Sequence, residues 1–218
     1  MERIELLKYW KKSVDNAIFQ TWKAFNKDQQ LFLTENDVKC FLYNELRNTR
    51  PNQPYAVHSE VTHYANHQTD SAYRFRDLVL LNPAKIRNNT FEDPLENMQG
   101  IKSKGFSHIG ESVFFEIKFQ RIENIRINQN DLENLATYQY QEGENNPKYA
   151  ILIWASKHGF FGENILPDQM VLAVQHFTNH VGAVYIPFEN VFAFVFNHME
   201  IHAIEWTGGA WDLRKIAP

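Results

Sequence analysis

Three charged residues interrupt two apolar segments in the middle of the chain. Asp77 lies in FRDLVL, and Glu116 and Lys118 lie in FFEIKFQ. Both segments have the composition of central strands covered on both faces, where an unpaired charge is costly. Side chains alternate along a strand, so Glu116 and Lys118 share one face. If the strand of Asp77 pairs with theirs, two carboxylates and an ammonium meet at one point, an arrangement that suits Mg²⁺.

Each feature has a plainer interpretation when it is taken alone. An E-x-K triplet in a strand is typical of an exposed sheet face or of a simple Glu–Lys pair. Asp77, likewise, can mark the end of a shorter strand. The joint pattern is far less common, and it favours a functional site because a β-α-β unit follows it directly.

Hydrophobic periodicity and capping signals predict the elements that position these residues. For the first part of the chain we predict a helix over 2–26, a second helix capped by Thr34 and ending before Pro51, and strands over 54–64, 72–81 and 111–119. After these come a helix opening at 130–131, a strand over 149–156, a helix over 167–180, a short strand near 181–186, and a hairpin of VFAFVF and MEIHAIEW. The strands at 111–119 and 149–156, with the helix between them, form a β-α-β unit and hence a parallel pair.

The predicted fold class is therefore α/β, with a mixed sheet flanked by helices in a single domain over 1–218. Its core spans about 34–156 in the order α-β-β-β-α-β. An N-terminal helix (1–30) precedes the core, and a C-terminal α/β extension (157–218) follows it.

Composition narrows the class of protein. The 218 residues are 44% hydrophobic and 22% charged, which is enough apolar content for a buried core. No apolar run approaches the roughly 20 residues of a membrane helix, and the first residues lack a signal-peptide pattern, so we expect a soluble, cytoplasmic protein without a membrane partner. The one cysteine, Cys40, excludes an intramolecular disulfide. The net charge of −4 means that any binding of nucleic acid must use a local basic patch.

The order of elements together with the D…E-x-K signature resembles the PD-(D/E)xK nuclease superfamily, over about 34–156. The resemblance implies a restriction-endonuclease-like core and metal-dependent hydrolysis of phosphodiester bonds, with DNA as the expected substrate. It implies Mg²⁺, for which Mn²⁺ substitutes, held by Asp77, Glu116 and the carbonyl of Ile117. Lys118 is expected to orient the attacking water or help to deprotonate it, and to stabilise the developing negative charge. The chain departs from the pattern in placing Arg76, rather than proline, before the aspartate.

The same resemblance implies a further acidic ligand, for which two candidates stay open. Glu45 falls on the apolar face of its helix, and Glu60 lies on the first strand. Asn134 and Tyr138 weakly resemble the Q-x-x-x-Y signature of the RecB-like branch, with Asn in place of Gln.

The cations expected to contact a phosphate backbone lie in the strand of Asp77, in the long polar segment 82–110 that follows it, or after the strand of Glu116. They are Arg74, Arg76, Lys85, Arg87, Lys102, Lys104, Arg121 and Arg126. The segment 157–218 leaves open a dimer face, a cover for the sheet, or a contact with substrate.

Two rival functions remain. The first is a catalytically silent nucleic-acid-binding or scaffolding protein on the same fold. The second, a glycosidase carboxylate pair, is disfavoured by the adjacent Lys118 and the β-α-β context. A zinc site at His63 and His67 is also disfavoured, because a strand does not hold residues four apart beside one ion.

Overall fold

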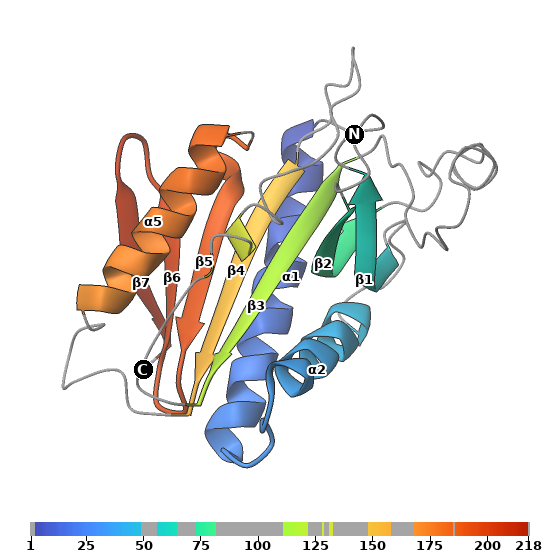
Figure 1. Ribbon diagram of the computed structural model, residues 1–218, viewed down its shortest axis with the longest axis vertical. Helices are drawn as coiled ribbons and strands as arrows, with labels where there is room; N and C mark the ends of the chain where they lie inside the picture. Colours follow the sequence, from blue (N-terminus) through green and yellow to red (C-terminus); the bar gives the residue numbers. More distant parts are fainter. Residues whose placement is uncertain are drawn as a thin grey trace.

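The computed structural model describes residues 3–48, 56–64, 73–81, 111–121, 128, 131–132, 148–157, 168–184 and 186–217 of the chain. Its centre is a seven-stranded sheet whose strands lie side by side in chain order (Figure 1). The strands are β1 (Ala56–Tyr64), β2 (Tyr73–Leu81), β3 (Ser112–Gln120), β4 (Lys148–Ser156), β5 (Val191–Phe196), β6 (Ile201–Trp206) and β7 (Trp211–Ala217). The helices are α1 (Arg3–Lys27), α2 (Glu35–Asn48), α5 (Asp168–Val184) and the short 3₁₀ helix η3 (Phe188–Asn190).

The sheet is mixed, which confirms the predicted α/β class. β3 pairs with β4 and β4 with β5 in parallel, whereas β1–β2, β2–β3, β5–β6 and β6–β7 are antiparallel. The predicted parallel pair is thus confirmed, and the bounds of β1 to β4 differ by no more than two residues from those expected. Parallel strands need cover on both faces, and β4 and β5, which pair in parallel, carry the most apolar sequences of the sheet.

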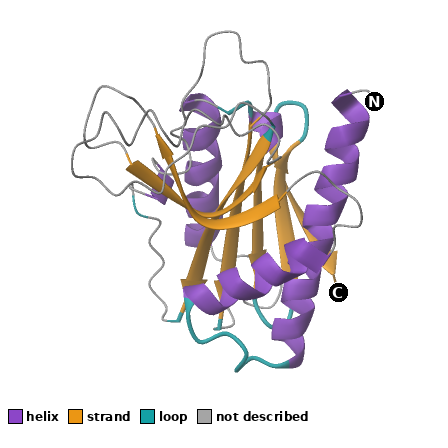
Figure 2. Ribbon diagram, turned by 90° about the vertical axis from the view of Figure 1, so that its right-hand side faces the viewer, coloured by secondary structure: helices purple, strands orange, loops and turns teal. Residues whose placement is uncertain are grey.

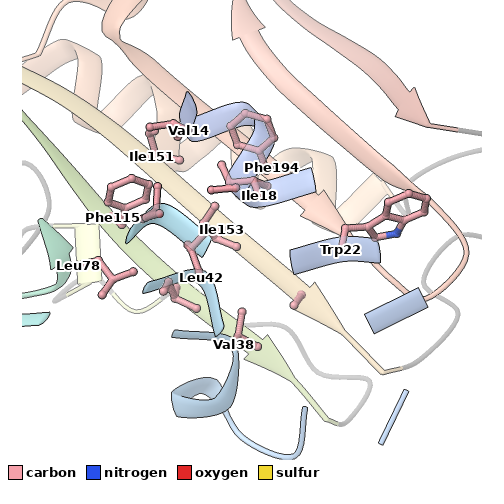
Figure 3. Packing of buried hydrophobic residues seen from close by; sticks show 14 of the residues in the cluster. Val14, Ile18, Trp22, Val38, Leu42, Leu78, Phe115, Ile151, Ile153 and Phe194 are labelled. Carbon is pink, nitrogen blue, oxygen red and sulfur yellow. The ribbon is translucent and has the colours of Figure 1, made fainter. Parts of the chain in front are cut away.

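Helices cover both faces of the sheet, in three layers (Figure 2). α1 and α2 pack on one face, where the apolar stripe predicted for each helix is buried against alternate residues of the central strands (Figure 3); this cluster includes Val14, Ile18, Trp22, Val38, Leu42, Phe115, Ile153 and Phe194. α5 packs on the other face, in a cluster that includes Val174, Phe177, Val181, Leu152, Trp154 and Val195. Each such large side chain contributes about 1.5–3 kcal/mol by its burial.

The predicted cap fixes the start of α2. Thr34 Oγ1 accepts the N–H of Asp37 at 3.2 Å, and Asp37 Oδ2 accepts the N–H groups of Leu33 at 2.9 Å and of Thr34 at 2.8 Å. These hydrogen bonds lower the pKa of Asp37, and the bond from the Leu33 N–H has the largest effect. The reciprocal pair satisfies amides that have no partner inside the helix. It thereby sets where the helix begins, and two residues near this start reach the candidate site.

Two predictions for the C-terminal part need correction. The short strand near 181–186 is wrong, since α5 continues to Val184 and buries Val181 in the same stripe as Val174 and Phe177. The strand β7 was not predicted. It follows a turn at Gly208 and Gly209, whose φ angles of 68° and 140° are conformations that glycine adopts without strain. The C-terminal extension therefore adds three strands to the same sheet.

Some predictions fall on parts of the chain outside the description. The helix expected after Asn130 is described at Asp131 and Leu132, which are helical, and its continuation from residue 133 lies outside. The segment 82–110 also lies outside. None of the described helices is long and apolar enough to cross a membrane.

Candidate active site

The register of the first three strands places acidic residues in one row. Leu78 lies opposite Phe115 and Val79 opposite Phe114, so the position of Asp77 faces that of Glu116. On the other side, β1 and β2 pair on both sides of Asp77, which puts Glu60 at the position opposite it. The side chain of Glu60 lies outside the described part, and its role as a ligand stays a prediction.

Asp77 lies where the β2–β3 ladder ends. The ladder pairs run from Leu81–Ser112 to Leu78–Phe115. Beyond this pair, a side chain replaces the backbone acceptor: Asp77 Oδ2 accepts the N–H of Ile117 at 2.8 Å. Its Oδ1 lies 3.4 Å from Nζ of Lys39. A side chain that replaces a backbone partner holds its own carboxylate firmly against the edge of β3.

Glu116 and Lys118 form the expected pair on β3. Lys118 Nζ lies 2.7 Å from Glu116 Oε1 and 3.2 Å from Asp131 Oδ1. The side chain of Glu116 is only 7% exposed and that of Lys118 is 19% exposed. Asp131, one of the two described residues of the helix after β3, thus forms a second ion pair with the lysine.

The start of α2 adds a second acid–lysine pair. Glu35 and Lys39 are four residues apart and so lie on one side of the helix. The carboxylate of Glu35 accepts a backbone hydrogen bond from Phe119 of β3, and it interacts electrostatically with Lys118 and Asp77. Together these residues form what we call the β2–β3 cluster: Glu35, Lys39, Asp77, Glu116, Lys118 and Asp131.

Sequence reasoning found three of these six residues. It missed Glu35 and Lys39, although their spacing of four at a helix start was a usable signal, and it gave Asp131 only a role in opening a helix. It selected Glu45 from the apolar face of α2 instead. Glu45 is ten residues from Glu35, a helical rise of about 15 Å, and its predicted role as a ligand stays untested.

Burial and neighbouring acids raise the pKa values of two carboxyl groups in the β2–β3 cluster. Burial has the largest effect on Glu116: together with the negative charge of Asp77 it raises the pKa to about 8, although Lys118 acts to lower it. Burial also raises the pKa of Glu35. Although burial opposes it, the Glu116 carboxylate raises the pKa of Lys118 above its ordinary value. Burial therefore shifts Glu116 toward its neutral form, while the ion pair with Lys118 favours the carboxylate.

The donor set fits a hard divalent cation. With all four acids ionised, four carboxylates and two ammonium groups have a formal charge of −2. The side-chain ligands are oxygens alone, which Mg²⁺ and Mn²⁺ prefer. In the described part of the chain, no three such side chains already surround a single point. Instead Lys39 and Lys118 hold the carboxylates of Asp77 and Glu116, so a cation would have to replace those lysines as the partner.

The predicted phosphate-binding cations have mixed outcomes. Arg76 is fully buried, and its guanidinium lies 5.0 Å from the centroid of the Phe114 ring, so its burial argues against the predicted contact with a phosphate backbone. Arg121, directly after β3, is exposed. The side chains of the others lie outside the description: Arg74, Lys85, Arg87, Lys102, Lys104 and Arg126.

Comparisons of the chain with protein-family models, with curated proteins and with solved structures found no match. The function therefore has to be argued from the β2–β3 cluster itself.

Proposed function

We propose that the protein is a metal-dependent nuclease that hydrolyses phosphodiester bonds, with DNA as the expected substrate. The observation that carries the proposal is the meeting of Asp77, Glu116 and Lys118 where β2 and β3 part. The order α2, β1, β2, β3, a helix start at Asp131, then β4 supports a restriction-endonuclease-like core, because it follows the α-β-β-β-α-β sequence of the PD-(D/E)xK superfamily.

Asp77 and Glu116 would hold Mg²⁺, with Glu35 and Asp131 as neighbouring acids and Glu60, Glu45 and the Ile117 carbonyl as the further predicted ligands. When bound, such a cation lowers the pKa of a water molecule and offsets charge on the phosphate.

Lys118 would supply the positive group beside that site. Its ammonium is held between Glu116 and Asp131, so its position is set from two sides. A charged donor fixed in this way can orient a water molecule and stabilise the negative charge that develops on the phosphate. The raised pKa of Lys118 keeps it a donor rather than a base.

The alternative is a catalytically silent protein that binds nucleic acid or acts as a scaffold. The observation that favours it is the pairing of both key carboxylates with lysines, since such ion pairs can simply hold the end of a sheet together. The two functions differ in what a divalent cation does to a nucleic acid substrate.

We expect cleavage of plasmid or single-stranded DNA in the presence of Mg²⁺ or Mn²⁺, and none in chelator. Ca²⁺ should support binding better than cleavage, because its longer bonds and irregular coordination make it the weaker Lewis acid. Gel assays of nicking, run beside electrophoretic binding assays, measure both effects. Undiminished cleavage in EDTA would contradict the metal mechanism, and binding without cleavage of either DNA or RNA would favour the silent alternative.

A further inference from the structure

The edge strand β7 exposes a row of backbone groups. It is the last strand of the sheet (Figure 1), and residues 212–216 are all exposed. The N–H of Thr207 bonds to the carbonyl of Ala210 and closes the β6–β7 hairpin. Along an antiparallel ladder, hydrogen-bonded and non-hydrogen-bonded pairs alternate, so the backbones of Asp212 and Arg214 bond to β6. The residues between and beside them, 211, 213 and 215, therefore turn their N–H and carbonyl groups away from the sheet.

On the face that carries α1, β7 bears one acid and one base, Asp212 and Arg214, beside Glu205 of β6. Asp212 lies directly opposite Glu205 of β6, a like-charge pair that destabilises antiparallel strands. Arg214 Nη2 donates to Glu205 Oε1 at 2.7 Å, and Lys11 Nζ of α1 lies 3.5 Å from Glu205 Oε2. Both ion pairs go to Glu205, whereas Asp212, among the described residues, interacts with Arg214 only electrostatically and forms no ion pair at contact distance. Asp212 is also exposed at the open edge of the sheet.

We propose that two copies of this chain associate through β7, antiparallel about Leu213, so that the seven strands of each copy join in one continuous sheet. At this register Leu213 meets Leu213 of the second copy, Asp212 meets its Arg214, and Trp211 meets its Lys215. Arg214 would then stand between Glu205 of its own chain and Asp212 of the other. The facing Asp–Arg pairs lie at non-hydrogen-bonded positions, where opposing side chains are closest.

The sequence of β7 favours this register over the two adjacent symmetric ones. Two-fold antiparallel pairing requires one residue to face its own copy. Centring the pair one residue away, on Asp212 or on Arg214, sets like charges against each other, which is unfavourable. Centring it on Leu213 joins two apolar side chains, each 40% exposed in the single chain. Charges on an edge strand normally discourage pairing, but Asp-x-Arg is complementary to itself when the strands run antiparallel.

Charge reversal tests the proposal in the full-length chain. Asp212→Arg alone and Arg214→Asp alone each set like charges opposite one another, twice by symmetry, and should weaken the dimer about 10- to 100-fold. An equimolar mixture of the two variants restores complementary pairs and should form a heterodimer. Sedimentation velocity over a range of concentrations measures each mass, and the parent should approach twice the mass of the chain.

The matched control is Lys12→Glu, a charge reversal on an exposed residue of α1, which should leave the dimer unchanged. Arg214→Asp also removes the bond to Glu205, so thermal unfolding of each variant checks that the β6–β7 hairpin persists. Asp212→Arg keeps that bond and is therefore the decisive variant. A parent chain that stays monomeric at every concentration, or an Asp212→Arg variant that dimerises as tightly as the parent, would overturn the proposal.

Discussion

Asp77→Asn, Glu116→Gln and Lys118→Met should each lower the rate of Mg²⁺-dependent DNA cleavage about 100- to 1,000-fold, the loss seen when a single preorganised charge or donor is removed from a catalytic site. The first two substitutions remove a charge from the cation's ligands, and the third removes the positive group beside them. All three are nearly isosteric, so the sheet should remain intact. Initial rates on plasmid DNA at saturating Mg²⁺, with circular dichroism as the check on folding, measure the effect.

The control is Glu189→Gln, the same chemical change at an exposed residue of η3, which should cleave at the parent rate. A second comparison separates the two acids of α2. Glu35→Gln should slow cleavage, because Glu35 interacts with Lys118 and Asp77, whereas Glu45→Gln should do so only if the ligand predicted from sequence is correct. If Lys118→Met cleaves at the parent rate, the assignment of the site is wrong.

Glu116→Gln should be more stable than the parent at pH 8, and the difference should vanish near pH 4.5. Burial raises the pKa of Glu116 from 4.5 to about 8. The folded chain therefore keeps a proton that the unfolded chain has released. A raised carboxyl pKa stabilises the fold fully below pH 4.5, and that stabilisation is lost as the pH rises to 8. Glutamine stays neutral throughout, so the gap should grow to about 2–4 kcal/mol at pH 8.

Denaturant unfolding of both proteins at pH 4.5, 6 and 8 in chelator gives this difference directly. In the parent, against the effect of burial, the Glu116 carboxylate raises the pKa of Lys118, so the lysine stays charged over this range. Added Mg²⁺ should reduce the gap at pH 8, because a bound cation stabilises the parent's charged carboxylate. A gap that is constant with pH would show that the Glu116 carboxyl is not held away from water as described.

The core of the site follows from sequence because the period of a strand is fixed. A spacing of two sets Glu116 beside Lys118, and strand pairing then sets Asp77 against them. The contribution of α2 does not follow in this way. Whether its first turn or its apolar face meets the site depends on the angle at which the helix crosses the sheet, and no periodicity records that angle. Glu45 is predicted as a ligand because it lies on the apolar face of the helix, whereas Glu35 is the acid of α2 that interacts with Lys118 and Asp77.

The errors near the C-terminus have local causes. Residues 181–186 read VGAVYI, an apolar β-branched run whose period does not separate strand from helix. The α5 helix extends there because Val181 continues a stripe begun at Val174. β7 carries alternating charges typical of an exposed segment, so its strand character depends on the Gly208–Gly209 turn that brings it back along β6. That glycine pair was the signal for the hairpin.

The sequential strand order has a consequence for how the chain folds as it is synthesised. Each strand pairs with the strand made just before it, so the sheet can grow at one edge without waiting for distant segments. α1 is the exception, since the indole N–H of Trp22 bonds to the carbonyl of Asn197, 175 residues later. The first helix made is therefore among the last to find its full set of partners. In pulsed hydrogen exchange during refolding, the amides of β3 and β4 should gain protection before those of α1.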